Sequence, residues 1–129
     1  MLADFYVSPM TCKPEDVVFA TEKNQMTMFF FADVQLRGEY PGYALRYFKD
    51  NSIAIHADEK ELTLLKNNTL DFLAISYYNS NVVSYEKNTM AIGNAELNPY
   101  LKANPWGWTI NPLGLYDCFL NYWDRYGKP

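Results

Sequence analysis

Asp71-Phe72-Leu73-Ala74-Ile75-Ser76-Tyr77-Tyr78 is the segment most informative about the fold class. The run is short and almost continuously apolar, which is typical of a parallel strand that is covered on both faces. A polar turn precedes it, and before that turn residues 58–66 have the pattern of a short helix with Leu62 and Leu65 on its inner face. This order of helix, turn and strand predicts an α/β fold with a strand over residues 71–78.

The segment before this strand is expected to be mainly helical. Residues 1–7 are predicted to end a strand, and residues 14–66 are predicted to form helices. Pro14 suits the first position of a helix, and the acidic pair Glu15-Asp16 suits its first turn. The apolar residues between positions 17 and 36 follow the 3.6-residue period only imperfectly, so one or two helices are predicted there.

The segment after the strand divides into a long loop and a helix. Residues 79–109 show no regular period, and loops of this length are usually functional or disordered. Four of the aromatic residues in this loop argue against disorder: Tyr85, Tyr100, Trp106 and Trp108. Residues 111–126 carry apolar side chains at three- and four-residue spacing, begin with Asn111-Pro112 as a cap and are followed by Gly127, so they predict a helix.

The composition restricts the classes of function. The chain has 129 residues and a net charge of −4, which fits one domain or a piece of one. Lysine and arginine form no basic stripe, so no nucleic-acid partner is expected. No apolar run approaches the roughly 18 residues that cross a bilayer, and the start lacks a basic n-region, so we expect a cytoplasmic protein with no membrane partner. One histidine and two cysteines do not make a four-ligand zinc set, so neither a metal nor a cofactor is expected.

The order of the predicted elements is incomplete. A strand, helices, a second strand, an aromatic loop and a helix follow one another, and another strand is expected next. Two strands cannot close a parallel sheet. The chain is therefore expected to be an excerpt of a larger α/β architecture.

Five stretches, taken in order, resemble the bacterial 6-phospho-β-glucosidases of glycoside hydrolase family 1. Asp33-Val34-Gln35-Leu36-Arg37-Gly38-Glu39-Tyr40-Pro41 is similar to the family segment Asp-x-Gln-x-Arg-Gly-x-Tyr-Pro. Met1-Leu2 resembles the end of the fifth barrel strand, and residues 71–78 resemble the sixth strand. Residues 98–115, with Trp106-Gly107-Trp108, resemble the loop on the aglycone side, and residues 124–129 resemble the approach to the seventh strand. The resemblance covers essentially the whole chain.

The resemblance implies a partial TIM (β/α)8 barrel and the retaining hydrolysis of a phosphorylated β-glucoside in carbohydrate metabolism. That reaction needs two carboxyl groups about 5–5.5 Å apart. In the family, the acid/base Glu lies in an Asn-Glu pair that ends the fourth strand, and the nucleophile lies in a Glu-Asn-Gly motif that ends the seventh. Neither motif occurs here, so we expect no catalytic residue in this chain and no activity from it alone.

Two residues are carried over by the resemblance as site residues. Tyr78 matches the second tyrosine of the family motif after the sixth strand, whose phenol hydrogen-bonds the nucleophile carboxylate and keeps it ionised and oriented. Trp108 matches a tryptophan beside the aglycone site, where an indole face can stack on a sugar or aryl group. Packing alone is the alternative for both. Trp106 is interpreted as structural, and the single histidine, His56, as a surface or packing residue.

Charged residues of the other motifs are interpreted as architectural. Arg37 and Tyr40 are expected to form an ion pair and an anchored turn on the helical side of the barrel, while Asp124 and Arg125 are expected to cap or pair locally.

A second class of function stays open at this point. The chain could be a non-catalytic carbohydrate-binding or protein-interaction module that uses its aromatic loop and exposed strand faces. The open barrel edges would then favour self-association, because Leu73 and Ile75 lack an opposing layer.

Overall fold

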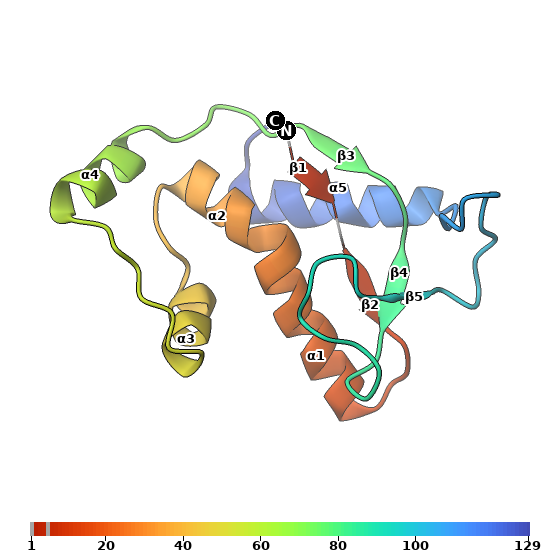
Figure 1. Ribbon diagram of the computed structural model, residues 1–129. Helices are drawn as coiled ribbons and strands as arrows, with labels where there is room; N and C mark the ends of the chain where they lie inside the picture. Colours follow the sequence, from red (N-terminus) through yellow and green to blue (C-terminus); the bar gives the residue numbers. More distant parts are fainter. Residues whose placement is uncertain (1, 5) are drawn as a thin grey trace.

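The computed structural model describes the backbone of residues 2–4 and 6–129 and the side chains of residues 6–129 (Figure 1). Its elements are, in order, β1 (Leu2–Asp4), β2 (Val7–Pro9), α1 (Pro14–Asn24), the π-helical segment η1 (Gln25–Phe29), α2 (Phe30–Arg37), α3 (Gly42–Asp50), α4 (Glu59–Asn67), β3 (Ile75–Tyr77), β4 (Asn81–Val83), β5 (Glu96–Leu97) and α5 (Pro112–Tyr126). The strand end expected over residues 1–7 falls partly on residues 1 and 5, which lie outside the described residues. Among the described residues, no helix is long and apolar enough to cross a membrane.

Two small sheets form the centre of the chain. β1 pairs in parallel with β3, and β2 pairs in parallel with β4, which also pairs antiparallel with β5. Leu2 faces Ile75 in the first ladder, whereas Val7 faces Asn81 in the second, so the register shifts by one residue between them. The segment between β3 and β4 thus holds one residue more than the segment that faces it. Extra residues of this kind bend a strand and re-aim its side chains.

The strand predicted over residues 71–78 is shorter than expected. Only Ile75–Tyr77 pairs with β1, and the residues before it are irregular. The backbone N–H of Leu73 instead donates to the carbonyl of Pro129 at 2.9 Å, which fastens the last residue of the chain beside the segment that leads into β3. The expected burial on both faces is also wrong, because none of residues 71–78 is buried and Phe72 is 66% exposed. Ladder pairing requires a partner strand, and β1 offers three residues.

The long loop predicted over residues 79–109 is also more regular than expected. It contains β4 and β5, and an isolated antiparallel bridge joins Ala103 to Thr109. These pairings join residues that are distant in sequence, so no periodic pattern in the sequence predicts them.

α1, η1 and α2 form one continuous helical stretch across the sheets (Figure 1). Pro14 occupies its first turn, together with the acidic residues Glu15 and Asp16. The imperfect period of the sequence has its cause in η1, since a π-helical turn rotates the buried face relative to an α-helix. At Asn24, just before η1, the side-chain amide accepts from the N–H of Val7 at 2.9 Å and donates to its carbonyl at 2.8 Å, which ties the helix to β2.

One hydrophobic cluster lies where α1 covers β2 and β4, and comprises Val7, Phe19, Ala20 and Val83. Beside it, Lys23 is 1% exposed, and its ammonium group donates to three backbone carbonyls, those of Thr89 and Asn94 at 2.6 Å and of Ala91 at 2.9 Å. Burial lowers the pKa of Lys23. We call this group the Lys23 anchor, because it fastens the loop between β4 and β5 onto α1.

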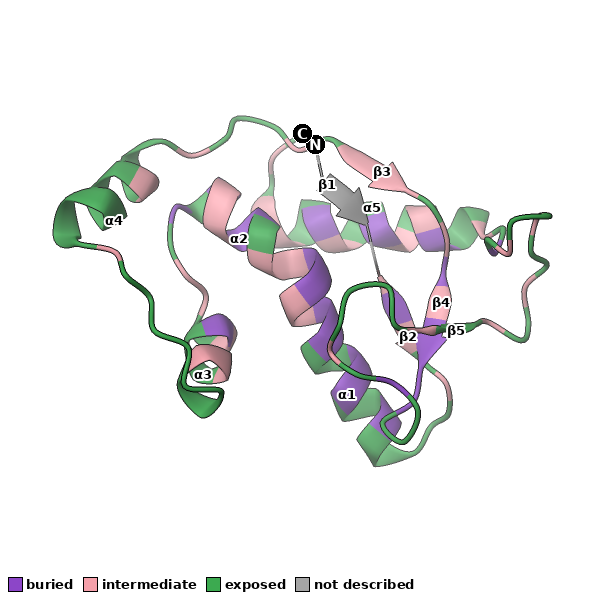
Figure 2. Ribbon diagram, in the orientation of Figure 1, coloured by how far each residue is buried: buried purple, intermediate pink, exposed green. Residues whose placement is uncertain are grey.

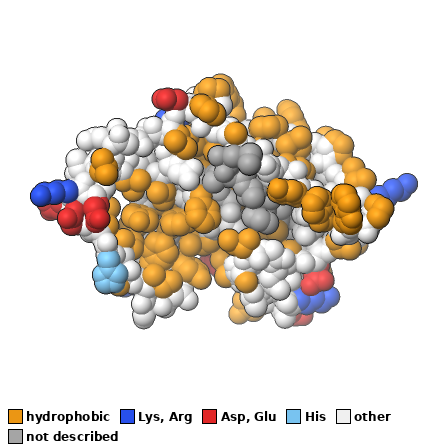
Figure 3. All heavy atoms as spheres, turned by 45° about the horizontal axis from the view of Figure 1, so that its top comes forward, with side chains coloured by type: hydrophobic (Ala, Val, Ile, Leu, Met, Phe, Trp, Pro, Cys, Tyr) orange, Lys and Arg blue, Asp and Glu red, His pale blue; other side chains and the backbone are white. Residues whose placement is uncertain are grey.

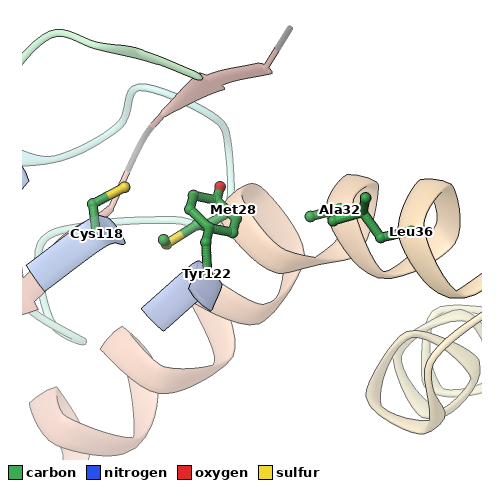
Figure 4. Close-up of a cluster of buried hydrophobic side chains, with 5 residues drawn as sticks. All are labelled: Met28, Ala32, Leu36, Cys118 and Tyr122. Atoms are coloured by element: carbon green, nitrogen blue, oxygen red, sulfur yellow. The ribbon is translucent and has the colours of Figure 1, made fainter. Parts of the chain in front are cut away.

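A second hydrophobic cluster lies between the continuous helix and α5. Met28, Ala32 and Leu36 contribute from η1 and α2, and Cys118 and Tyr122 contribute from α5 (Figure 4). Leu73, Ile75 and Tyr77 pack against this cluster from the strand side.

A buried carboxylate joins three helices. Asp33 on α2 is fully buried and accepts from the hydroxyls of Tyr43 at 2.5 Å and Tyr126 at 3.1 Å. Arg125 donates to the same carboxylate through Nε at 3.2 Å and Nη2 at 3.1 Å, and Arg37 lies at 3.5 Å. We call these five residues the Asp33 centre. Burial and the carboxylate raise the pKa of Tyr43 and Tyr126.

Two expectations about the helices are wrong. Arg125 does not pair locally, because its partner Asp33 is distant in sequence and close only once α2 and α5 pack. α4 has no buried residue (Figure 2), and Leu62 is 42% exposed instead of lying on an inner face. α4 is held mainly by its own capping box, in which Asp58 accepts from the N–H of Glu61 and Glu61 accepts from the N–H of Asp58.

Candidate functional site

Tyr78 stands at the carboxyl end of β3, directly after the last paired residue. It is 47% exposed, and its ring meets that of Trp108 edge to face, with centroids 5.3 Å apart and planes at 79°. Tyr78 lies in the segment between β3 and β4 that carries the extra residue. The structure thus brings together the two residues that the sequence singles out. We call Tyr78 and Trp108 the aromatic rim.

A tight turn presents Trp108. The Asn104 side-chain oxygen accepts from the N–H groups of Trp106 and Trp108, both at 3.0 Å. The backbone of Asn104 also bonds the carbonyl of Trp108 and the N–H of Gly107, each at 2.9 Å. Gly107 has a φ of 81°, a left-handed conformation that favours glycine. Four hydrogen bonds therefore fix the backbone of the turn from which the indole of Trp108 projects.

Buried polar groups fasten this turn to the strand. The N–H of Ser80 donates to the Thr109 hydroxyl at 2.9 Å, and that hydroxyl donates to the Ser80 carbonyl at 2.8 Å. The Asn111 amide donates to the Ser80 hydroxyl at 2.9 Å, and the Tyr77 hydroxyl bonds the same atom. Asn111 stands at the start of α5 but does not cap it with its side chain, because that side chain is engaged by Ser80.

Gly114 is required for this close approach. A Cβ atom at this position would collide with the hydroxyls of Ser80 and Tyr77 and with the amide of Asn111. The first turn of α5 can therefore sit directly against the polar group beneath the aromatic rim.

The aromatic rim borders a cavity of about 230 Å³. The cavity is lined by Tyr77, Tyr78, Asn104, Trp108, Thr109, Ile110, Asn111, Pro112 and Leu115. None of these is acidic, so this cavity has no carboxylate pair for general acid/base work. Sites for small molecules usually measure about 300–1,000 Å³. This cavity is smaller, as expected if it forms only one wall of such a site.

The arrangement offers stacking and hydrogen bonding. An indole face and a phenol ring contact the apolar face of a sugar or an aryl group, and the phenol, amide and hydroxyl groups can orient polar atoms. Among the side chains of residues 6–129, no group of three or more His, Cys, Asp or Glu is placed to hold a metal ion.

Other residues considered from the sequence lie elsewhere. His56 is exposed in the connector between α3 and α4. Arg37 makes the ion pair with Asp33, and Tyr40 stacks on Phe30 with centroids 6.2 Å apart. Trp106 is 80% exposed, so its interpretation as a packing residue is wrong.

The sequence reasoning missed Asn104, Ser80, Thr109 and Asn111. Asn104-Pro105-Trp106-Gly107 contains a usable signal, since Asn and Gly are the residues that tight turns favour. The contact of Ser80 with Thr109 spans the whole loop and has no signal in the sequence.

Comparisons with known proteins agree with this geometry. The profile of glycosyl hydrolase family 1 matches residues 1–129. Aryl-phospho-beta-D-glucosidase BglH of Bacillus subtilis is 44% identical over 134 residues, and Phospho-cellobiase of Klebsiella oxytoca is 42% identical over 134 residues. Both matches cover 100% of this chain, which spans 28% of the length of each relative.

Solved structures give the same result for the fold. A family 1 β-glucosidase from Thermotoga maritima superposes with a TM-score of 0.77 at 21% identity, over 99% of this chain and 28% of that one. A β-glucosidase from Exiguobacterium marinum superposes with a TM-score of 0.75 at 17% identity, over 96% and 28%. The expected α/β architecture, a segment of a TIM barrel, is confirmed. The chain belongs to glycosyl hydrolase family 1.

Proposed function

We propose that this chain forms the aglycone-side wall of the substrate site in a retaining glycoside hydrolase that cleaves 6-phospho-β-glucosides. The observation that carries the proposal is the contact of Tyr78 with Trp108 above a cavity at the carboxyl end of β3. In TIM barrels this end of the strands carries the active site. The names of the relatives, an aryl-phospho-β-D-glucosidase and a phospho-cellobiase, give the substrate class.

Tyr78 is the positioning residue of this wall. Its half-exposed phenol projects from the end of a strand, and no group among the described residues is engaged with its hydroxyl. The hydroxyl can therefore donate to a carboxylate on a neighbouring strand end, which stabilises the ionised form of a nucleophile.

Trp108 is the contact for the leaving group. Its indole borders the cavity while remaining 41% exposed, and the Asn104 turn fixes the backbone from which it projects. A rigid indole excludes water and stacks on a ring without losing much conformational freedom.

Hydrolysis itself needs a pair of carboxylates that the cavity lining does not contain. We therefore assign this chain no catalytic residue and expect no turnover from it alone. We place the activity in the cytoplasm, because a phosphorylated sugar carries a charge that the bilayer core excludes.

A chimaera tests the proposal. Residues 1–129 would replace the matching 134-residue stretch of the Bacillus subtilis relative, and hydrolysis of p-nitrophenyl 6-phospho-β-glucoside would be measured. We expect the chimaera to turn over substrate. In it, Tyr78→Phe should lower kcat about 10- to 100-fold by analogy with other lost active-site hydrogen bonds, and Trp108→Ala should mainly raise KM.

Tyr116→Phe, on the exposed face of α5, is the matched control and should leave both constants unchanged. A folded chimaera in which neither Tyr78→Phe nor Trp108→Ala changes kcat or KM would contradict the proposal.

An interaction role is the second candidate, and an apolar groove favours it. The groove measures about 220 Å³ and lies between β3 and α5. The groove is lined by Leu36, Leu73, Ile75, Phe119, Tyr122, Trp123, Tyr126, Lys128 and Pro129. Hydrophobic side chains also gather over the face that lies at the top of Figure 1 (Figure 3).

We propose that a second copy of the chain covers this groove when the chain is alone. Light scattering after gel filtration should then give a mass above the 15.0 kDa of one chain. Phe119→Glu, which puts a charge at the groove, should restore the mass of one chain. A single-chain mass for the unmodified protein would exclude self-association.

A further inference from the structure

The two parallel ladders meet at a register shift, and Tyr78 lies within it. Tyr77 is the last paired residue of β3, whereas β4 begins with Asn81, which faces Val7. If the register of the first ladder continued into the second, Val7 would face Ser80 instead. Tyr78 would then be an ordinary paired residue of one uninterrupted ladder. Specific contacts must therefore favour the shifted register.

One such contact holds Val7. The buried side chain of Asn24 accepts from the N–H of Val7 at 2.9 Å and donates to its carbonyl at 2.8 Å, so it occupies both backbone groups of that residue. β2 is the outer strand of its sheet among the described residues, and outer strands carry backbone groups that can pair with another strand. At Val7, Asn24 takes the place of such a strand.

A second contact holds Ser80 in the same way. The N–H of Ser80 donates to the hydroxyl of Thr109 at 2.9 Å, and this hydroxyl donates to the carbonyl of Ser80 at 2.8 Å. Both residues are buried. Since Thr109 directly follows Trp108, this contact also fixes the backbone beside the indole relative to the segment that contains Tyr78.

The backbone groups that remain allow the observed register and exclude the continued one. In a parallel pair, one of the two facing residues supplies both its N–H and its carbonyl to the other strand. The N–H of Met10 donates to the carbonyl of Val83 at 2.8 Å, so β4 supplies these bonds in the observed ladder. A pair of Val7 with Ser80 would need both groups of one of these residues, and the two side-chain contacts already hold them.

We propose that Asn24 and Thr109 form a register clamp and act as positioning residues, which keep Tyr78 outside the ladders and in contact with Trp108. The inference rests on the proposed function where it treats Tyr78 as a site residue, and on the backbone contacts alone where it concerns the register. Asn24 lies on α1 and is not among the residues that line the cavity, so its effect on the site passes through β2 and β4.

Amide exchange in the unmodified chain gives the first test of the register clamp. The N–H groups of Val7 and Ser80 should exchange about as slowly as that of Asn81, because the two side chains protect them as a strand would. Fast exchange at Val7 or Ser80, with Asn81 protected, would overturn the clamp.

Variants that open one side of the clamp test it on the same chain. Thr109→Val keeps the shape of the side chain and removes its hydroxyl, and Asn24→Leu removes the amide. In either variant, we expect NMR contacts between the strands to place Val7 opposite Ser80 in a measurable share of the molecules. Thr109→Ser should keep the observed register, as should the matched control Thr63→Val, whose hydroxyl bonds within the exposed α4. Retention of the observed register in either folded variant of the clamp would overturn it.

Kinetics of the chimaera with the Bacillus subtilis relative test the positioning role. Asn24→Leu should lower kcat about three- to tenfold, the size of effect expected for coupled residues. In a Tyr78→Phe background it should lower kcat no further, because its effect passes through a phenol that this background lacks. A purely structural defect reduces the folded fraction and lowers kcat equally in both backgrounds, and that result would overturn the positioning role.

The outcomes separate this inference from the proposed function. An unaltered register in the clamp variants, together with a lowered kcat in Tyr78→Phe, overturns the clamp and leaves the proposed function intact. A shifted register, together with unchanged kcat and KM in both Tyr78→Phe and Trp108→Ala, overturns the proposed function and the positioning role with it.

Discussion

The Asp33 centre and the aromatic rim are built in opposite ways. At the Asp33 centre, one fully buried carboxylate on α2 accepts from two phenols and a guanidinium that come from α3 and α5. At the aromatic rim, two half-exposed rings meet each other at the carboxyl end of β3 and border an open cavity. The first is directed inward and the second outward.

We therefore assign the Asp33 centre to the stability of the fold and propose that the aromatic rim contacts a ligand. Asp33 and Arg125 join helices that lie outside the strands, and such residues act on stability in barrel folds. In the function that we propose, Tyr78 and Trp108 stand where side chains of neighbouring strands converge on a substrate. The two regions belong to one α/β unit, so changes in each should have separable effects on stability and on ligand binding.

Asp33→Asn should give the largest loss of stability. It removes the charge that Arg125 needs and leaves buried donors around a poorer acceptor, and breaking a buried pair costs about 3–5 kcal/mol. The free energy of unfolding in urea is the measurement. Asp124→Asn on the exposed face of α5 is the control and should stay within about 0.5 kcal/mol of the unmodified chain.

A total unfolding of Asp33→Asn is within this expectation, because small domains are stable by only about 5–15 kcal/mol. Tyr43→Phe removes one hydrogen bond of the same centre and should cost about 1 kcal/mol. If Asp33→Asn unfolds no more easily than Asp124→Asn, the Asp33 centre does not hold the helices together.

Lys23→Met should give the second-largest loss of stability. The variant keeps an apolar stem but leaves three loop carbonyls without their donor, at a cost of about 3 kcal/mol. Amide exchange in residues 88–96 should accelerate more than exchange in α5. Lys13→Met is the matched control, since its ion pair with Glu86 is exposed on both sides and such pairs contribute about 0–1 kcal/mol.

Alkaline pH should destabilise the Asp33 centre gradually. The pKa of Tyr43 and that of Tyr126 are raised by burial and by the carboxylate, whereas in the unfolded chain both ionise near a pKa of about 10. Above that pH the unfolded chain releases protons that the folded chain retains, so stability is present below it and falls as pH rises.

Urea unfolding between pH 9 and 12 measures this effect, and Tyr43→Phe should flatten the decline. An equally steep decline in Tyr43→Phe and in the unmodified chain would assign it to other groups.

Trp108→Ala should change stability least. The side chain is 41% exposed, and its loss removes two ring contacts, at a cost of about 1 kcal/mol. Thermal unfolding measures this cost, with Trp123→Ala on α5 as an exposed control. A loss as large as that of Asp33→Asn would mean that the rim is part of the core.

The sequence anticipates features that depend on local pattern or on long motifs. Gly127 after α5 and Pro14 at the start of α1 follow general rules for helix ends. Tyr78 and Trp108 were found because they stand in motifs shared with a family, and no property of either residue alone would have selected them.

What escaped prediction depends on contacts between distant segments. Arg125 meets Asp33, Ser80 meets Thr109, and Lys23 meets the loop after β4 only after the chain has folded. The shortened β3 has the same origin, since a strand extends only as far as its partner. In the sequence, these charged and polar residues look like ordinary surface residues. Only their burial in the folded chain distinguishes them.

Paired measurement on two variants tests the separation of the regions most directly. Asp33→Asn and Trp108→Ala would each be compared with the unmodified chain for urea unfolding and for the NMR response to phenyl β-D-glucoside. We predict that Asp33→Asn loses stability and, where still folded, retains the response of Trp108. We predict that Trp108→Ala keeps nearly full stability and loses the response at Tyr78. Equal losses of stability in both variants, or an unchanged ligand response in Trp108→Ala, would contradict the separate roles of the Asp33 centre and the aromatic rim.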